Sequence, residues 1–225
     1  MRAPVTVLIP TLNAAASLGP LLANLYEAMT AGLIREIILA DGGSTDGTLE
    51  AAERIGARLV QTPPGRGGQL AAGAQIAEGN WLLVLHADTT LPPGWMHAVK
   101  DHIRDHRDAG YFGLAFDTKG LAATIVAGWA NLRARFFGLP YGDQGLLVPM
   151  ALYRSVGGYS DIPLMEDVAL ARALKGRLRR IPCKVTTSAV RYLRDGWLRR
   201  GWRNLTTLGL YFAGVDPERL VQRYR

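Results

Sequence analysis

Carboxylates that follow apolar runs are the residues of this sequence whose spacing suggests chemistry. Asp88 stands just after the run Leu82 to Leu85, and Asp41 stands just after the run Glu36 to Ala40. Such runs are typical of strands buried on both faces, and open parallel sheets bind their ligands where the strands end. A turn-forming role is the ordinary alternative for an Asp at this position. The pattern predicts a binding site at one edge of a sheet.

Asp88 suits a divalent cation. A cation that holds a diphosphate commonly takes one or two protein carboxylates and completes its shell with substrate oxygens, so Asp88 is predicted to bind Mg²⁺ or Mn²⁺. His86 lies two residues earlier and becomes a second candidate ligand if the strand continues through it. A hydrogen-bonded structural histidine is the alternative for His86.

Glu166 and Asp167 form a pair of adjacent carboxylates ahead of a helical pattern. Acidic residues at a helix N-terminus often do no more than interact with the helix dipole. One carboxylate can nevertheless cap the helix while the other points into a cleft. Because neighbouring like charges raise a carboxyl pKa, the pair also suits a proton acceptor.

A glycine-rich segment, Gly65 to Gln69, precedes the alanine-rich run Leu70 to Glu78, which is predicted to be helical. It is not a dinucleotide fingerprint, because Leu70 occupies the place of the third glycine. A glycine-rich loop that carries Arg66 into a helix N-terminus suits a phosphate group. A plain flexible loop is the alternative.

Length and composition describe the scaffold that must position these residues. With 225 residues, 48% apolar and 20% charged, the chain fits one α/β domain, or such a domain with an extension. Cys183 is the only cysteine, which excludes an intrachain disulfide and indicates a reducing, cytoplasmic compartment. The run Val5 to Ile9, ended by Pro10, is predicted to be a first strand and not part of a signal peptide.

Basic residues gather at the C-terminal end. Residues 1–171 contain 12 Lys and Arg against 16 Asp and Glu, a balance of −4, whereas residues 172–225 contain 14 against 3, a balance of +11. Arginines and aromatic residues alternate from Arg191 onward. This tail is predicted to be a helical extension that packs on the domain, lies on an anionic membrane surface or, less favoured, contacts nucleic acid.

A second helical stripe is predicted between Lys119 and Gly138, where Leu121, Ile125, Trp129 and Leu132 recur at helical spacing. Core packing is the favoured use of such a stripe, and an acceptor or membrane groove is the alternative.

Six motifs in order resemble the family 2 glycosyltransferases of the GT-A fold: VLIPTLNAAASL, EIILADGGSTDGT, GRGGQLAAG, LHADT, YGDQG and LMEDVAL. The likeness includes a small bacterial subfamily with an HAD metal motif, often labelled arsenosugar biosynthesis. It implies an α/β fold with a mostly parallel sheet and helices on both faces over residues 1–190, followed by a basic helical extension over residues 191–225. His86 departs from the family pattern, since it replaces the first Asp of the usual DxD motif.

The resemblance also implies roles for individual residues. The residues expected at the nucleotide sugar are Pro10, Thr11, Asn13, Asp41, Gly42, Arg66, Gln69, His86, Ala87 and Asp88. Asp88, with His86 beside it, is expected to hold the metal. Those expected at the acceptor or the donor sugar are Tyr141, Asp143 and Gln144. Asp167 is expected to be the general base, with Glu166 as the second candidate.

The resemblance therefore implies a metal-dependent, inverting transfer of a sugar from a nucleoside diphosphate sugar, with a UDP-sugar favoured. The acceptor is a hydroxyl of a lipid, a polyprenyl phosphate or a small metabolite. A nucleotidyltransferase is disfavoured because the turn after the first strand, PTLNAAAS, has neither Gly nor Lys. A non-catalytic nucleotide-binding or membrane-adaptor module is disfavoured because such a module has no use for all of Asp41, Asp88 and the Glu166 and Asp167 pair.

Overall fold

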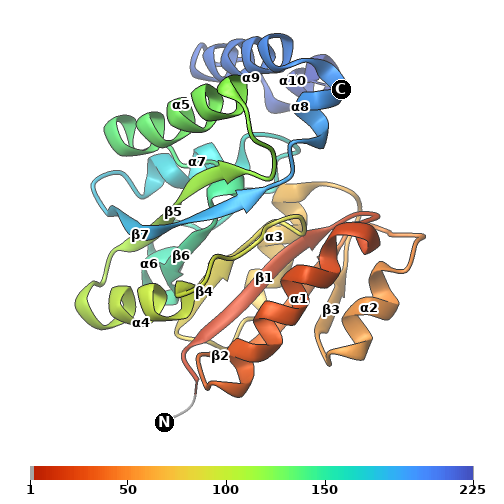
Figure 1. The fold of residues 1–225 in the computed structure, drawn as a ribbon, viewed down its shortest axis with the longest axis vertical. Helices are drawn as coiled ribbons and strands as arrows, with labels where there is room; N and C mark the ends of the chain where they lie inside the picture. Colours follow the sequence, from red (N-terminus) through yellow and green to blue (C-terminus); the bar gives the residue numbers. More distant parts are fainter. Residues whose placement is uncertain (1–2, 225) are drawn as a thin grey trace.

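The computed structural model describes residues 3–224, and its centre is one mixed sheet of seven strands (Figure 1). The strands are β1 Val5–Thr11, β2 Ile34–Asp41, β3 Arg58–Gln61, β4 Trp81–Val84, β5 Ala109–Phe116, β6 Leu146–Pro149 and β7 Leu178–Thr187. They lie in the order β3-β2-β1-β4-β6-β5-β7. Strands β1 to β4 are parallel, while β6 runs antiparallel to both β4 and β5.

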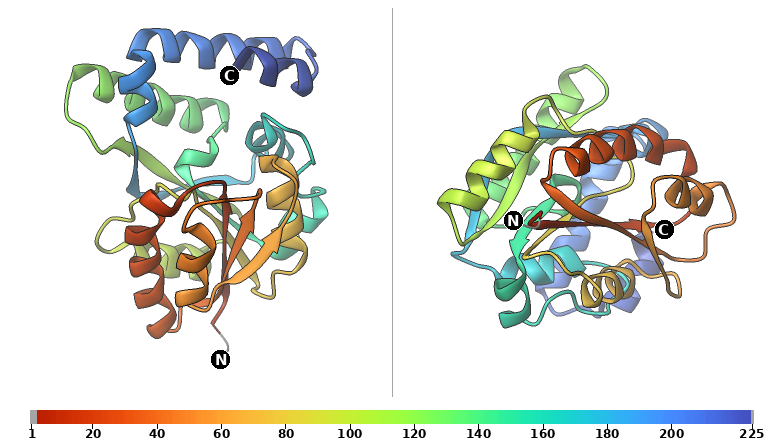
Figure 2. Two further views of the ribbon diagram at one scale, coloured as in Figure 1. Left: turned by 90° about the vertical axis from the view of Figure 1, so that its right-hand side faces the viewer. Right: turned by 90° about the horizontal axis from the view of Figure 1, so that it is seen from below.

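Helices cover both faces of this sheet, as the sequence predicts. The helices are α1 Ala15–Thr30, α2 Thr48–Arg54, α3 Arg66–Gln75, α4 Trp95–Asp105, α5 Leu121–Phe137, α6 Met150–Ser155, α7 Glu166–Ala173, α8 Val190–Asp195, α9 Trp197–Phe212 and α10 Pro217–Tyr224, with one 3₁₀ turn, η1 Gly142–Gln144. Seen from below, α1 and α4 lie on one side of the sheet and α3 and α6 on the other (Figure 2). Each side has its own buried apolar cluster, so the mostly parallel α/β architecture is confirmed.

Strand β4 occupies the middle of the sheet, between β1 and β6. All four of its residues are buried, which accounts for its unbroken apolar sequence. The strand ends at Val84, two residues before His86. His86 and Asp88 therefore do not lie on one face of a strand. Both side chains project from the loop that follows β4.

Two local predictions are wrong. The glycine-rich segment is not a loop, because α3 already begins at Arg66. The stripe on α5 is not core: Leu121 and Ile125 are 78% and 61% exposed, and the helix instead buries small residues such as Ala123, Ala127 and Ala130. Small side chains let α5 approach β5 closely, so its large apolar residues face outward.

The C-terminal helices lie over the carboxyl edge of the sheet. Both Figure 1 and the left view of Figure 2 show α9 running across the top of the molecule, with α5 below it. Residues of α9 contact α5, α8 and α10. The predicted helical extension is therefore present, and it is positioned above the strand ends where chemistry is expected.

Candidate functional site

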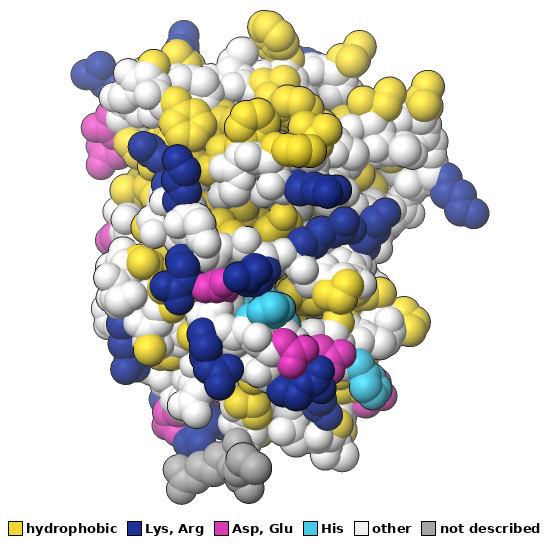
Figure 3. Space-filling model, turned by 90° about the vertical axis from the view of Figure 1, so that its left-hand side faces the viewer, with side chains coloured by type: hydrophobic (Ala, Val, Ile, Leu, Met, Phe, Trp, Pro, Cys, Tyr) yellow, Lys and Arg dark blue, Asp and Glu magenta, His cyan; other side chains and the backbone are white. Residues whose placement is uncertain are grey.

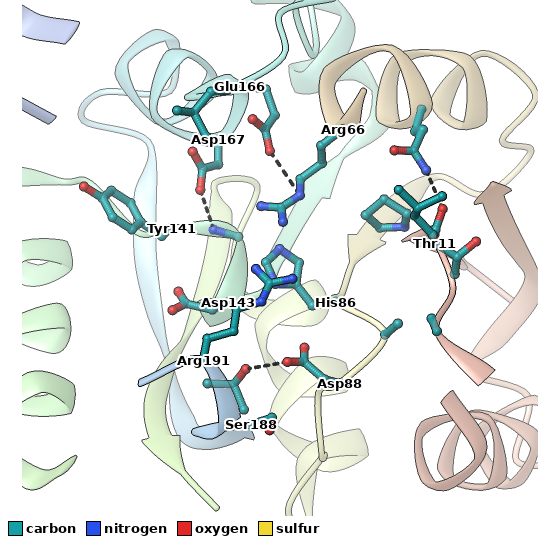
Figure 4. Close-up of a pocket in the computed structure, with 18 of the residues that line it drawn as sticks. Thr11, Arg66, His86, Asp88, Tyr141, Asp143, Glu166, Asp167, Ser188 and Arg191 are labelled. Carbon is teal, nitrogen blue, oxygen red and sulfur yellow. Dashed lines mark hydrogen bonds and ion pairs between the residues drawn. The ribbon is translucent and has the colours of Figure 1, made fainter. Parts of the chain in front are cut away.

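A cavity of about 560 Å³ lies between the carboxyl edge of the sheet and the C-terminal helices. Its volume is in the range of small-molecule sites. Figure 4 shows polar side chains from distant parts of the chain pointing into it. The predicted site residues that line it are Pro10, Thr11, Asn13, Arg66, Gln69, His86, Ala87, Asp88, Tyr141, Asp143, Glu166 and Asp167.

Asp41, Gly42 and Gln144 are the predicted site residues that do not line this cavity. The side chain of Asp41 is fully buried. Its carboxylate accepts hydrogen bonds from Thr11 Oγ1, from the backbone N–H of Gly43 and from both the N–H and Oγ of Ser44. Burial alone would raise the pKa of Asp41, but these hydrogen bonds outweigh it and hold the pKa below its ordinary value. The expectation that Asp41 shares one hollow with Asp88 and Asp167 is thus not met.

Asn13 ties the loop after β1 to the loop after β2. It adopts a left-handed conformation (φ 50°), which Asn tolerates better than most residues. Its backbone N–H donates to Ser44 Oγ at 2.8 Å, and its Oδ1 accepts from the N–H of Thr45 at 2.9 Å. On the adjoining wall, Gln69 Nε2 donates to the carbonyls of Thr11 and Ala40, both at 2.7 Å. These bonds give the predicted nucleotide end of the cavity a fixed backbone.

Gln144 supports the η1 turn from beneath. Its side chain is fully buried, and its Nε2 donates to the carbonyl of Phe112 at 3.2 Å. Its Oε1 accepts from the backbone N–H of Tyr141 and from Arg133 Nη2. The guanidinium of Arg133 also lies 3.3 Å from the ring centroid of Tyr141. Gln144 therefore positions Tyr141 and Asp143, which face the cavity.

Glycine in the first turn of α3 brings Arg66 close to the catalytic candidate Glu166. A Cβ at Gly67 would lie 2.4 Å from the carbonyl oxygens of Ser160 and Ile162, so only glycine lets α3 approach the loop before α7. This approach places Arg66 Nε 3.6 Å from Glu166 Oε1. Burial and the charge of Asp167 raise the pKa of Glu166 to about 7, and Arg66 opposes that rise.

Asp167 is held by the η1 turn. Its Oδ2 accepts from the backbone N–H of Gly142 at 2.8 Å, and its Oδ1 accepts from the N–H of Val168 at 2.7 Å (Figure 4). A Cβ at Gly142 would lie 2.5 Å from His86 Nε2, so the imidazole packs directly against this turn. Met165, at the N-cap of α7, takes a left-handed conformation (φ 69°) that L-residues rarely adopt.

Asp143 is the least compensated carboxylate of the cavity. Among the residues that the structure describes, its Oδ1 is buried and has no hydrogen-bond partner. Burial raises the pKa of Asp143 to about 6; the charge of Arg133 opposes this, and the charges of Asp167 and Asp88 add to it. A carboxylate in this state has unused capacity for a donor or a cation.

Asp88 fits a metal that is shared with a substrate. Its Oδ2 accepts a long hydrogen bond, 3.4 Å, from Thr187 Oγ1. Within residues 3–224 there is no cluster of three or more His, Cys, Asp or Glu side chains arranged to hold an ion, so substrate oxygens would have to complete the shell. Burial and the nearby charges of Arg66 and Arg191 hold the pKa of His86 well below its ordinary value. His86 is thus neutral at pH 7, but two cations and the η1 turn surround it, which favours its structural alternative.

Sequence reasoning missed the residues that close the cavity from above. Arg191 and Tyr192 of α8, Arg200 and Asn204 of α9 and Val221 of α10 all line it. Figure 4 shows Arg191 extending toward the centre of the site, beside His86. Arg200 Nη1 pairs with Asp195 Oδ2 at 2.7 Å, which orders this roof. The excess of arginine in the tail was the only sequence signal, and it did not indicate which arginines turn inward.

Known proteins resemble this chain in sequence and in fold. A 99-residue segment is 40% identical to a PGL/p-HBAD biosynthesis glycosyltransferase of Mycobacterium bovis; it covers 40% of this chain and only 38% of that protein. The structure of S. aureus TarS 1-349 in complex with UDP-GlcNAc superimposes with a TM-score of 0.65 at 17% identity, over 82% of this chain and 58% of that one. Glucosyl-3-phosphoglycerate synthase from Mycobacterium tuberculosis, in complex with Mn²⁺, UDP and glucosyl-3-phosphoglycerate, gives 0.57 at 19% identity, over 90% and 78%.

The two solved structures share the fold of this chain. At such low sequence identity, a shared fold does not show a shared activity. A model of the family Glycosyl transferase family 2 matches residues 6–143, which include the carboxyl ends of β1, β2 and β4 and the turn that carries Asp143. Because this match spans more than half of the sequence, the chain belongs to glycosyl transferase family 2.

Proposed function

We propose that the protein transfers a sugar from a nucleoside diphosphate sugar, a UDP-sugar by preference, to a hydroxyl acceptor with inversion at the anomeric carbon. The observation that carries the proposal is the position of Asp88 and Asp167, which line one cavity although 79 positions separate them in the chain. Asp88 is suited to the diphosphate end and Asp167 to the acceptor end. The nucleotide lies along Pro10, Thr11 and Asn13 in this proposal.

The diphosphate leaving group needs positive charge in the cavity. Asp88 is the proposed protein ligand of Mg²⁺ or Mn²⁺, with His86 as a second candidate, and the bound ion would offset the charge that develops on the diphosphate. Arg66 and Arg191 flank the same point from opposite walls. A guanidinium group can donate two parallel N–H hydrogen bonds to a phosphate group. Both arginines are therefore proposed to bind the diphosphate.

Asp167 is the proposed general base. Its hydrogen bond from Gly142 fixes one carboxylate oxygen, while the side chain is only partly buried and lines the cavity. Glu166 has the pKa suited to proton transfer at neutral pH, about 7, but it is 2% exposed and pairs with Arg66. Glu166 is therefore the second candidate, and its more direct role is to orient Arg66.

Tyr141 and Asp143 are the proposed contacts to the donor sugar or the acceptor, because both line the cavity beside Asp167. Gln144 is proposed to act through them, since it lies behind the turn. The preference for UDP is supported by the UDP and UDP-GlcNAc complexes among the structural neighbours. A lipid, a polyprenyl phosphate and a small metabolite remain alternative acceptors. The sequence relative named above carries the PGL/p-HBAD label, which does not support an arsenosugar acceptor.

A metal-dependent binding and turnover assay tests the proposal. Calorimetry with UDP, with and without Mn²⁺, should show tighter binding with the metal, and a panel of UDP-sugars should release UDP. Asp88→Ala should abolish the metal-dependent part of both signals. Asp101→Ala is the matched control, because Asp101 lies exposed on α4 and pairs with Arg104.

Two results would reject parts of the proposal. Full metal-dependent activity in Asp88→Ala would show that the metal ligand is wrongly assigned. UDP binding without any turnover across the panel would favour the non-catalytic module, and release of pyrophosphate from a nucleoside triphosphate would favour a nucleotidyltransferase.

A further inference from the structure

An apolar face with a basic border lies on the outer side of α5, α8 and α9. On α5 the exposed side chains follow one helical stripe, and on α9 they follow another. The large apolar residues exposed on the three helices are Leu121, Ile125, Trp129, Leu132, Phe136, Phe137, Val190, Leu193, Leu198, Trp202, Leu205 and Phe212. Helices α5 and α9 are in contact, so the two stripes lie on neighbouring helices.

The degree of exposure is unusual for residues of this type. Leu198 is 90% exposed, Trp202 71% and Phe136 69%. Single exposed apolar residues are common, but an extended group of them on a folded chain marks a surface with a partner. Figure 3 shows hydrophobic side chains gathered over the upper part of the molecule, with a band of Lys and Arg side chains below them.

The positive charge around this face indicates an anionic partner. Helices α5, α8 and α9 contain seven arginines and a single acidic residue, Asp195. Arg133 and Arg200 are buried and Arg191 lines the cavity, so the arginines left around this face are Arg135, Arg194, Arg199 and Arg203. Asp195 is already engaged by Arg194, Arg200 and Arg203. A second copy of the chain docked on this face would bring one basic surface against another, whereas an anionic surface would complement it.

We infer that this face docks on an anionic lipid bilayer, with the apolar side chains of α5, α8 and α9 entering the interface and the exposed Arg135, Arg194 and Arg199 contacting lipid headgroups. Leucine, tryptophan and phenylalanine on one helix face with arginine around them is the arrangement of interfacial helices. No helix in the described part of the chain has both the length and the hydropathy to cross a membrane, so docking would be in the plane of the interface.

The same helix would then serve the membrane and the site. The outer face of α9 presents Leu198, Trp202 and Leu205, while Arg200 and Asn204 on its inner face line the cavity. Docking would thus hold the cavity directly beneath the headgroups. This inference does not depend on the proposed transferase reaction, and it can be tested without turnover.

Vesicle sedimentation tests the inference with the full chain. The wild type should sediment with vesicles of phosphatidylcholine and phosphatidylglycerol, weakly with phosphatidylcholine alone, and its tryptophan emission should shift to shorter wavelength on binding. The double variant Leu198→Glu and Trp202→Glu should bind at least about 10-fold more weakly. Tyr26→Glu is the matched control, because Tyr26 is 60% exposed on the distant helix α1.

Further variants keep the test decisive. Ile125→Glu on α5 should weaken vesicle binding as well, which guards against a folding defect confined to α9. Asp167→Asn should bind vesicles like the wild type, so that loss of catalysis and loss of docking are distinguished. Equal binding of all variants would overturn the inference. So would a lipid-independent dimer that the Leu198→Glu and Trp202→Glu substitutions dissociate, since it would assign the face to a second copy.

Discussion

The two walls of the cavity are built in different ways. The lower wall consists of strand ends and the turns that follow them, where side chains such as Asn13 and Gln69 are fixed by short hydrogen bonds to backbone groups. The upper wall consists of helices α8 to α10, which present long side chains such as Arg191 and Arg200. The lower wall is built from hydrogen-bonded polar groups, whereas the upper wall supplies positive charge on long side chains, of which Arg200 is held by Asp195.

The charge of the sequence divides in the same way. Residues 1–171 have a balance of −4 and residues 172–225 a balance of +11. A nucleoside diphosphate sugar bound between these walls would meet carboxylates at its metal and acceptor positions and guanidinium groups at its phosphates. The extension from residue 191 onward is therefore part of the proposed site. The domain boundary at residue 190 stays a prediction.

Asp167→Asn is expected to have the largest effect on activity. Asn keeps an acceptor for the N–H of Gly142 but cannot take a proton, so kcat should fall by about 10²- to 10⁴-fold while the KM of the donor changes little. Glu166→Gln is the comparison variant and should keep much more of the activity. If the two variants exchange these effects in a steady-state assay, Glu166 is the base.

Gly142→Ala should come next, because an added methyl group would displace His86 from the turn that holds Asp167. A shift of the base by a fraction of an ångström should reduce kcat by up to about 10²-fold. Gly128→Ala on α5 is the control, since its Cβ would meet no atom within 4 Å. Equal activities for the two variants would show that the η1 turn does not position Asp167.

Arg191→Ala tests the upper wall. Removal of a guanidinium that donates to the diphosphate should weaken UDP binding by roughly 10- to 100-fold, as measured by calorimetry. Arg194→Ala is the matched control, because Arg194 is on the same helix but is 72% exposed and pairs with Asp195 outside the cavity. Identical affinities would mean that the lower wall alone binds the nucleotide.

Glu166→Gln should have the smallest effect on activity, and its expected effect is on stability. The pKa of Glu166 is raised to about 7 in the folded protein, so ionisation destabilises the fold as pH rises from about 4.5 to 7. Gln does not ionise, so the variant does not lose stability in this way. As pH rises through this window, the free energy of unfolding of the variant should come to exceed that of the wild type by up to about 3 kcal/mol. Urea unfolding at pH 5 and pH 8 measures the difference. A difference that stays constant with pH would show that the raised pKa is wrong.

Several elements of this molecule were predictable because local pattern decides them. The buried strand β4, the start of α2 at Thr48 and the start of α7 at Glu166 all follow from apolar periodicity and from acidic or hydroxyl residues at helix starts. The convergence of Asp88 and Asp167 was predictable as well, since the resemblance placed both at one site. Asp41 was placed in the same hollow for the same reason, but hydrogen bonds from its own loop turn it inward.

The sequence by itself determined the order of the strands and helices, the carboxylates at their ends and the excess of arginine after residue 171, because each depends on neighbours in the chain. Only the tertiary structure decided that α3 starts at Arg66, that the stripe of α5 faces outward and that Arg191 enters the cavity. These outcomes depend on how closely distant segments of the chain approach each other, as Gly67 approaches Ser160 and Ile162. Local sequence does not determine such distances.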